Sequence, residues 1–274
     1  MTVNVSPGRP TWRPTVRIGT RPAVVLVIAS LAGLATFFWP LVVAAPTDGT
    51  SQGAPFIFLA ILPVLVVVVL AELSSGGLDA KAVAVLGVLA AVGAALRPLG
   101  AGTAGLETVF FLLVLAGRVF GSGFGFVLGT TTLFASALLT AGVGPWLPFQ
   151  MIAAAWVGLG AGLLPGRASL RGRSEIVLLC VYGAVAAQVY GLLMNMSGWP
   201  YGIAAAGTGL SYVPGGGFVE NLHRFVVYSV TTSSLGWDLG RALTNIVLIA
   251  VVGPAVLAAL RRAARRARFG DPPG

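Results

Sequence analysis

The sequence predicts an all-α integral membrane protein with about eight transmembrane helices. Hydrophobic residues make up 57% of the 274 residues and charged residues only 9%. A soluble domain usually carries about 25% charged residues, so this chain has too few to cover a water-facing surface. The apolar residues are also grouped into runs, each close to the roughly 20 residues that a helix needs to cross a bilayer. Composition and patterning therefore indicate the same class.

The apolar runs follow one another from residue 23 to residue 260. The first is too long for a signal-peptide core, so we expect a retained helix after a disordered basic tail at residues 1–22. The fourth is short and ends at a glycine-rich break, which leaves open a tilted or partly interfacial helix and a seven-span chain. The expected spans are Ala23–Ala45, Pro55–Leu73, Ala80–Leu96, Leu106–Phe120, Phe124–Ala141, Leu147–Leu164, Glu175–Met196 and Leu239–Leu260.

The placement of the basic residues predicts the orientation. With eight spans, both termini share one side, and of the 17 Lys and Arg residues only Arg97, Arg224 and Arg241 fall on the other. An excess of Lys and Arg marks the cytoplasmic side of a membrane protein. Both termini are therefore predicted to be cytoplasmic, with a second basic tail at residues 261–274. A seven-span chain would put the two terminal arginine clusters on opposite sides, so eight spans are preferred.

Two neighbouring runs, about Phe124–Thr140 and Pro148–Leu164, predict a tightly packed hairpin. They are joined by the short turn Gly142–Trp146. Small residues recur in both runs at helical spacing and would let the two helix backbones approach closely. These residues are Gly125, Gly129, Ala153, Gly158 and Gly162.

The motifs of several enzyme classes are absent from the sequence. It contains no phosphate-binding P-loop, no nucleophile elbow of a serine hydrolase and no histidine cluster for a transition metal. His223 is the only histidine, and Cys180, the only cysteine, lies inside an apolar run and is expected to pack there. We therefore expect no enzymatic activity, no metal and no cofactor.

Polar side chains gather at the predicted external ends of several spans, where ionisable groups are costly and tend to be functional. Taken singly, some have simpler roles: Asp238 and Arg241 are three residues apart and can pair, and Asp238 can be an acid at a helix N-terminus. Taken together with the long aromatic loop 197–238, they indicate a capped pocket for a small molecule with rings to stack on. Within that loop, Phe218–Leu235 is expected to be a packed or half-immersed helix. The predicted substrate-binding residues are Arg97, Glu107, Trp146, Gln150, Asn195, Trp199, Tyr201, His223, Asp238, Arg241 and Asn245.

The third run has small residues at a spacing of four, in the pairs Ala90/Ala94 and Ala91/Ala95. Such pairs let another helix pack closely. Packing within the chain and docking of a partner subunit are both consistent with this pattern.

From about Ala80 to Leu260 the sequence resembles the substrate-binding S components of energy-coupling factor (ECF) vitamin transporters. The similar segments are FGFVLG at 124–129, GVGPWLPFQM at 142–151, GLGAGLLP at 158–165 and WDLGRALTN at 237–245. The resemblance implies a six-helix core at residues 80–260 in a bacterial cell membrane, with an external vitamin pocket. It also implies docking onto a transmembrane coupling subunit, which sits on two ATPase subunits, through the four alanines Ala90, Ala91, Ala94 and Ala95.

Two features depart from the family pattern. The two N-terminal helices at residues 23–74 are extra, and we expect them to form an anchor, a docking surface or part of the fold. The histidine-rich N-terminus of nickel and cobalt relatives is missing, which argues against a bare metal ion as substrate. The long external loop and the Gly-Pro-Trp turn look most like cobalamin-type or uncharacterised members of the family.

Three other functions stay open at this point. The chain could be a stand-alone facilitator of a small solute, or a structural scaffold. It could also be a membrane enzyme that acts on a lipid or isoprenoid through Glu107, Asp238 and His223.

Overall fold

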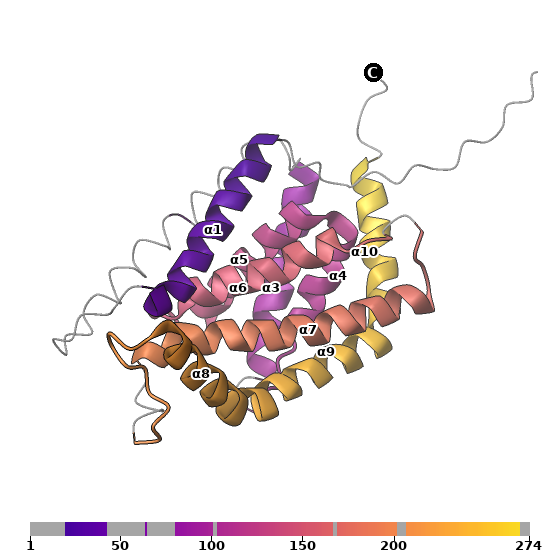
Figure 1. Cartoon of the computed structure of the whole chain (residues 1–274). Helices are drawn as coiled ribbons and strands as arrows, with labels where there is room; N and C mark the ends of the chain where they lie inside the picture. Colours follow the sequence, from indigo (N-terminus) through magenta and orange to yellow (C-terminus); the bar gives the residue numbers. More distant parts are fainter. Residues whose placement is uncertain are drawn as a thin grey trace, which may run out of the picture.

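The computed structural model of the chain describes residues 20–42, 64, 80–100, 103–166, 169–201 and 207–268. Every secondary-structure element within these ranges is helical, which confirms the predicted all-α class (Figure 1). Residues 1–19 of the expected tail 1–22 and the second expected span, Pro55–Leu73, lie outside the described residues apart from residue 64, and residues 20–22 belong to the first helix instead of to a disordered tail. The helices are α1 (Thr20–Val42), α3 (Ala80–Leu96), the 3₁₀ turn η1 (Arg97–Leu99), α4 (Phe110–Phe120), α5 (Ser122–Leu139), α6 (Leu147–Leu163), α7 (Arg173–Gly198), the 3₁₀ turn η2 (Trp199–Tyr201), α8 (Phe218–Ser229), the π-helix η4 (Val230–Asp238), α9 (Leu239–Val251) and α10 (Gly253–Arg268).

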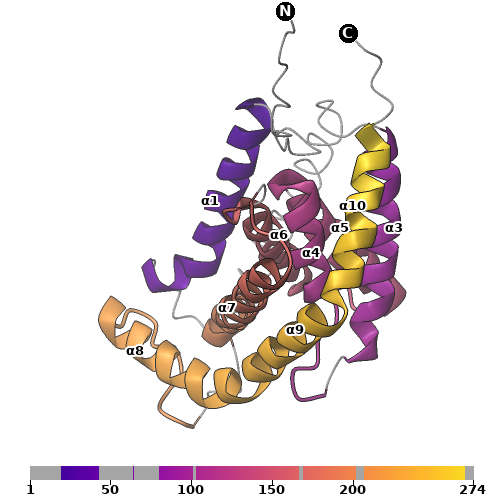
Figure 2. The same cartoon turned by 90° about the vertical axis from the view of Figure 1, so that its right-hand side faces the viewer.

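Several of the described helices are apolar enough for a membrane. Ala80–Leu99, Ser122–Leu139 and Arg173–Gly198 are each long enough to cross one, and a fourth span results if Phe218–Val251 and α10 act together. Three shorter apolar helices, Ala23–Phe38, Phe110–Phe120 and Leu147–Leu163, pack with them. These helices are consistent with a membrane-embedded protein. In Figures 1 and 2 the start of α1 and the end of α10 lie at the same end of the molecule.

The short helix α4 is the centre of the bundle. Its sequence, FFLLVLAGRVF, is apolar on nearly all sides, and every residue from Phe110 to Phe120 is buried. It contacts α5, α6, α7, α9 and α10. A helix that is hydrophobic all round belongs in a core, and α4 takes that position within the bundle. The break after it falls at Gly121, whose φ of 114° favours glycine.

The predicted hairpin is formed by α5 and α6, the most extensively contacting pair of helices. Gly125 and Gly158 face each other across the interface, and a Cβ atom on either would overlap the backbone carbonyl of the other. Gly129 lies against the Ala154 carbonyl, and Gly162 against the backbone of Ser122. The close approach expected from the small residues is therefore confirmed, and it depends on the absence of side chains at these positions.

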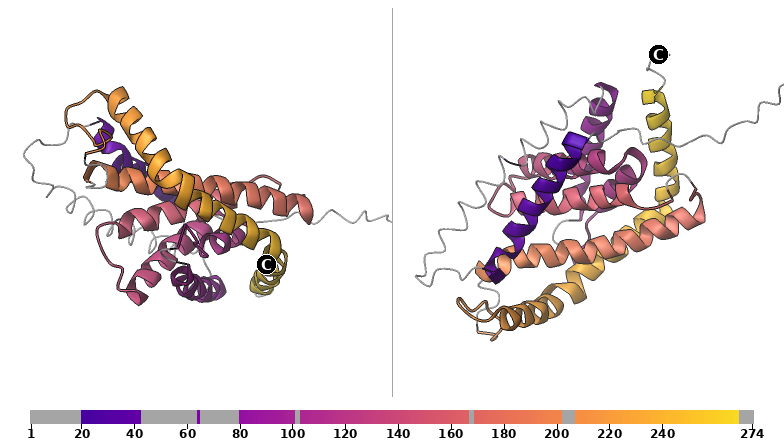
Figure 3. Two further views of the ribbon diagram at one scale, coloured as in Figure 1. Left: turned by 90° about the horizontal axis from the view of Figure 1, so that it is seen from below. Right: turned by 45° about the horizontal axis from the view of Figure 1, so that its top comes forward.

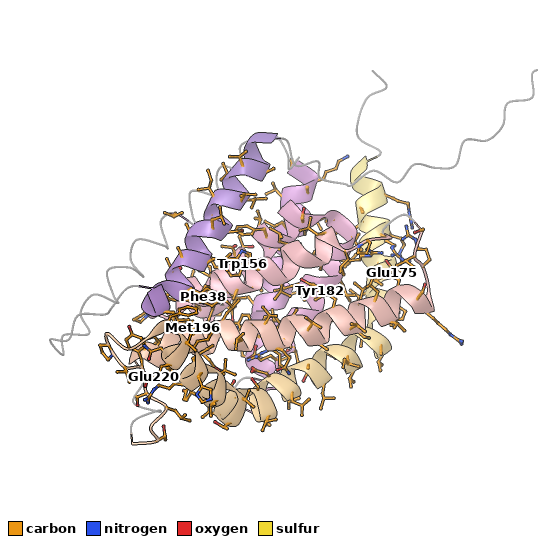
Figure 4. All side chains as sticks on the ribbon, viewed as in Figure 1. Phe38, Trp156, Glu175, Tyr182, Met196 and Glu220 are labelled. Carbon is orange, nitrogen blue, oxygen red and sulfur yellow. The ribbon has the colours of Figure 1, made fainter. Side chains whose placement is uncertain are left out.

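The first extra helix, α1, belongs to the packed body. Phe37 is fully buried and its ring centroid lies 4.9 Å from that of Phe149 and 5.8 Å from that of Trp156, both on α6. Trp156 donates a hydrogen bond from Nε1 to Ser30 Oγ at 3.0 Å. Three roles were left open for the two N-terminal helices, and these contacts show that α1 is part of the fold. Figure 4 labels Trp156 of α6 and Phe38 of α1.

The C-terminal third differs from the prediction of one straight span, Leu239–Leu260. Helix runs without a break from Phe218 to Val251, and then bends by 67° into α10. The bend falls at Gly253 and Pro254, because proline has no N–H to donate and its ring clashes with the preceding turn. Figure 3 shows the long helix crossing α7 obliquely before α10 turns away. The predicted span Leu239–Leu260 therefore contains a bend, and the two bent helices together can still form one broken span.

The two ends of this C-terminal unit also extend beyond the predicted elements. Phe218–Leu235 is helical as expected, and Asn221 ties it to the preceding loop by accepting from Val213 N and donating to Val213 O. The basic segment, interpreted from the sequence as a tail from residue 261, is helical as far as Arg268. Alanine and arginine are strong helix formers, and Leu257, Leu260 and Ala264 give this helix a buried face.

Candidate functional site

Three charged side chains meet between α4, α7 and α9 in the arrangement that we call the Glu107–Arg241–Asp238 cluster. Arg241 donates from Nη1 to Asp238 Oδ1 at 2.7 Å and from Nη2 to Glu107 Oε1 at 2.8 Å. Asp238 is completely buried and Arg241 is 6% exposed. One guanidinium thus links two carboxylates that are far apart in the chain. The simple pairing expected for Asp238 and Arg241 is confirmed, and Glu107 extends it.

Backbone geometry brings Asp238 into the interior. Asp238 ends the π-helix Val230–Asp238, and it continues into α9 with helical dihedral angles. The acid therefore lies inside a continuous helix, so its expected position at a helix N-terminus is wrong. Its carboxylate packs directly on Gly191 of α7, where a Cβ would overlap it. Ser233 and Ser234 donate to Asp238 Oδ2 at 3.2 Å each, which supplies partners for the second carboxylate oxygen.

Aromatic rings and unpaired polar atoms complete this region. The Arg241 guanidinium carbon lies 5.0 Å from the Tyr190 ring centroid and 5.8 Å from that of Phe110, within cation–π range. Buried Arg241 Nε has no hydrogen-bond partner within the described part of the chain, and the same holds for Asn195 Nδ2 on α7. Buried polar atoms of this kind are normally satisfied by water or a ligand. Asn245 lies one helical turn from Arg241 and donates to the Gly183 carbonyl at 3.1 Å.

A second polar contact, Arg97 with Gln150, joins η1 to α6. Arg97 Nη2 donates to Gln150 Oε1 at 3.0 Å, and Nη1 lies 3.4 Å from Ser136 Oγ on α5. Both side chains are half-buried. The structure thus brings five of the predicted site residues together in two groups. Arg97 lies with Gln150, and Glu107 lies with Asp238 and Arg241.

The predicted aromatic residues and the histidine lie elsewhere. Trp199 is 2% exposed and packs edge-on against Tyr212 and Phe225, with Nε1 bonded to the Leu210 carbonyl. Trp199 is therefore a core residue of a small hydrophobic cluster, to which residues 207–229 contribute Tyr212 and Phe225. Trp146 is 52% exposed and donates to the Gly142 carbonyl of its own turn, so its ring lies along the turn. His223 is exposed on α8, and the side chain of Tyr201 lies outside the described residues.

The four alanines of α3 divide into two pairs. Ala90 and Ala94 are buried, next to Gly93, which lies against Thr132 of α5. Ala91 and Ala95 are exposed, and no atom lies within 4 Å of a Cβ built at Gly87 one turn earlier. Packing thus distinguishes the two pairs: Ala90 and Ala94 lie inside the bundle, and Ala91 and Ala95 face outward.

A further charged group, which sequence reasoning did not single out, surrounds Glu175 at the start of α7. We call it the Glu175 cluster. Glu175 is 1% exposed and accepts from Arg118 Nε at 2.9 Å and from Arg261 Nη2 at 2.6 and 2.7 Å. Arg118 also donates to the carbonyls of Leu164 and Pro165. The sequence predicts that all these arginines lie on one side of the membrane, and Glu175 begins a span on that side. This shared position is the sequence signal that could have indicated the cluster.

The Glu175 cluster has more cations than anions. Arg171 lies 3.9 Å from Glu175, so three guanidinium groups surround one carboxylate. Partial burial lowers the pKa of Arg171, and the positive charges of Arg261 and Arg118 lower it further, whereas Glu175 raises it. Figure 4 places Glu175 beside α10, at the opposite end of α7 from Met196.

The arrangement of these groups limits the chemistry that they can perform. Each buried carboxylate is already bonded to arginine, so none is placed as a free general base. Among the described residues, no three His, Cys, Asp or Glu side chains are grouped to hold a metal ion. The Glu107–Arg241–Asp238 cluster and the Arg97–Gln150 pair consist of charged and amide groups that are bonded to one another.

Comparison with known proteins adds no relative. No protein-family model matches the chain, and neither a curated protein nor a solved structure matches it.

Proposed function

We propose that this chain is the substrate-specific membrane subunit of an ATP-driven importer of the ECF type. In this proposal it crosses the cell membrane about eight times, with a six-helix core at residues 80–260 and both termini in the cytoplasm. It binds a vitamin or related small molecule on the external side. A transmembrane coupling subunit and two ATPase subunits then drive delivery.

The observation that carries the proposal is the buried Glu107–Arg241–Asp238 cluster. Ionised side chains within apolar helices are costly, and they typically mark a solute pathway or a partner contact. Here one arginine serves two acids and still has an unpaired Nε, with Asn195 Nδ2 also unpaired. Unsatisfied donors beside aromatic rings favour a ligand with acceptor groups and a flat ring.

The Arg97–Gln150 pair supports the same placement of the ligand. The two side chains come from different helices and are half-buried, so a solute can replace one partner without unfolding the core. The resemblance implies that the loop after the first core helix covers the substrate pocket. Arg97 lies directly after α3, in η1, and Gln150 lies in the first turn of α6, next to the hairpin turn.

The exposed pair Ala91 and Ala95 supplies the proposed contact with the coupling subunit. Together with Gly87 they form a smooth face on α3, against which another helix can pack closely. We assign the contact to Ala91 and Ala95 rather than to Ala90 and Ala94, because the bundle already covers the latter pair.

Binding is tested with the purified full-length chain against a panel of riboflavin, thiamine, biotin, folate and cobalamin by isothermal calorimetry. We expect one of them to bind, and Arg97→Ala and Gln150→Ala to weaken that binding by at least about tenfold, the loss of one well-made charged hydrogen bond. Arg262→Ala, at an exposed position of α10, is the control and should bind like the parent. No binding of any compound would contradict the proposal.

Coupling is tested in vesicles that contain the chain with or without the coupling subunit and the ATPases. We expect uptake only with the complete set and ATP, and loss of uptake but not of binding in Ala91→Trp. Val185→Trp, on an exposed face of α7, is the matched control. Uptake by the chain alone would instead establish a stand-alone facilitator.

A further inference from the structure

A pocket of about 500 Å³ lies between the start of α7 and the bend that joins α9 to α10. Its wall is apolar on one side and basic on the other, at the far end of α7 from the proposed solute site. The lining residues are Gly172, Arg173, Glu175, Ile176, Val177, Ala250, Pro254, Leu257 and Arg261.

The basic side of the pocket has hydrogen-bond donors that are not bonded to other described residues. Arg173 is exposed and makes no hydrogen bond or ion pair with any other described residue. Arg261 is held to Glu175 through Nη2, and within the described ranges its Nε and Nη1 make no such bond. The first backbone N–H groups of α7 also lack partners within the helix, as at any helix start, and they border the same space.

The acid in the pocket does not cancel this positive charge. Glu175 already accepts from Arg118 and Arg261 and lies 3.9 Å from Arg171. Arg173 is not among its partners, so the cluster and the pocket together have a surplus of cations. Such a surplus attracts an anion, and the start of a helix favours one as well.

The apolar side of the pocket continues along the outside of the molecule. Val177 lines the pocket and begins a stripe of exposed valines on α7 at a spacing of four, followed by Val181, Val185 and Val189. Val247 and Val251 are exposed on α9, next to Ala250 of the pocket wall. Exposed apolar faces formed by rows of valines, on a protein with membrane-compatible helices, are suited to contact with acyl chains.

We infer that this pocket binds the phosphate headgroup of an anionic phospholipid. The headgroup bonds to Arg173, Arg261 and the first N–H groups of α7, and an acyl chain lies along Val177 and Val181. Basic pockets between membrane helices bind anionic lipid headgroups in this way. The continuous apolar stripe distinguishes a lipid from a free phosphate, for which a pocket without an apolar exit would suffice. The bound lipid joins α7 to the α9–α10 bend.

The test uses native mass spectrometry of the full-length chain in detergent with three probes: dioleoyl phosphatidylglycerol, dioleoyl phosphatidylcholine and soluble glycerol phosphate. We expect retention of phosphatidylglycerol in preference to phosphatidylcholine, and no competition by glycerol phosphate at equal concentration. Arg173→Gln should weaken phosphatidylglycerol binding about fivefold, the contribution of one basic residue near a lipid surface. Because Arg173 has no described partner, the variant should melt like the parent.

Two matched comparisons separate a site from general attraction. Arg262→Gln removes the same charge from an exposed position that does not line the pocket, and it should leave binding unchanged. Val177→Glu puts an acid at the pocket and should weaken binding more than Val185→Glu, two turns along the same face. Equal retention of both lipids, equal effects of Arg173→Gln and Arg262→Gln, or full competition by glycerol phosphate would each overturn the inference.

Discussion

The two charged clusters of this protein are built from the same groups in opposite proportions. Beside the C-terminal half of α7, near Ala187 and Gly191, Arg241 is shared by Glu107 and Asp238. At the other end, Glu175 is shared by Arg118, Arg261 and, at longer range, Arg171. The first has one cation for two anions, and the second has three cations for one anion. The two clusters therefore differ in which charge is indispensable.

Burial makes this difference consequential. The shared member is nearly inaccessible in both clusters, at 6% exposure for Arg241 and 1% for Glu175. Removing it strands its partners in an environment where an unpaired charge costs several kcal/mol. Removing an outer member, such as Glu107 with its side chain 28% exposed, leaves the remaining groups paired. Stability should therefore depend on the shared residue far more than on the number of ion pairs.

The largest effect is expected from Glu175→Gln. The substitution keeps the shape of the side chain but removes the single anion among the arginines, and it leaves Arg118, 2% exposed, without charge compensation. We expect a loss of about 4 kcal/mol in the free energy of unfolding. Chemical denaturation in mild detergent, followed by circular dichroism, measures it. A loss below about 1 kcal/mol would show that water reaches Arg118 and that the cluster is not closed.

Arg241→Met should cost about 3 kcal/mol, because Asp238 and Glu107 then face each other without a cation. A triple variant that also carries Glu107→Gln and Asp238→Asn removes all the charges, and it should recover most of the loss. The same denaturation experiment on the single and triple variants tests whether the loss of stability comes from the unpaired charges of Asp238 and Glu107. If the triple variant is no more stable than Arg241→Met, the loss comes from packing against Tyr190 rather than from stranded charge.

Gly191→Ala disturbs the same cluster without removing a charge. A Cβ at this position would overlap the Asp238 carboxylate, so this buried side chain must move and its bonds to Arg241, Ser233 and Ser234 are disturbed. Overpacking of this kind costs about 2 kcal/mol. Gly198→Ala on the same helix is the control, since no atom lies within 4 Å of its Cβ, and it should be neutral or slightly stabilising. Equal melting temperatures for the two variants would contradict the close contact.

Sequence patterns predicted the class of the fold well, because the class depends on a local property, the runs of apolar residues along the chain. Ala80–Leu96 is a helix with the predicted bounds, and the small residues of the α5–α6 hairpin pack as expected. The last span could not be predicted in the same way. Gly253 and Pro254 mark the place of the bend, but apolar content continues smoothly across them, and the direction of α10 depends on its packing against α4 and α9.

The predicted site residues show the limits of one-dimensional reasoning more clearly. Charge and helical spacing identified Asp238 with Arg241, but not that Glu107, separated from them by more than a hundred residues, completes the cluster. An aromatic residue in a loop is equally consistent with a ligand platform and with a small core. Trp199 belongs to a small core, because Tyr212 and Phe225 close around it. Only the three-dimensional contacts distinguish these two outcomes.

The smallest effect is expected from Glu220→Gln, the same chemical change as at Glu175 but on the surface of α8. Glu220 pairs with Arg224 one turn later at 2.8 Å, with side chains 57% and 27% exposed. Water already solvates both groups, so the pair should contribute only about 0.3 kcal/mol to the free energy of unfolding, and high salt should abolish even that. Denaturation at low salt and in about 1 M salt checks this. A loss comparable to that of Glu175→Gln would mean that the number of ion pairs, rather than the burial of the shared charge, determines stability. In that case the contrast between the two clusters would have no energetic meaning.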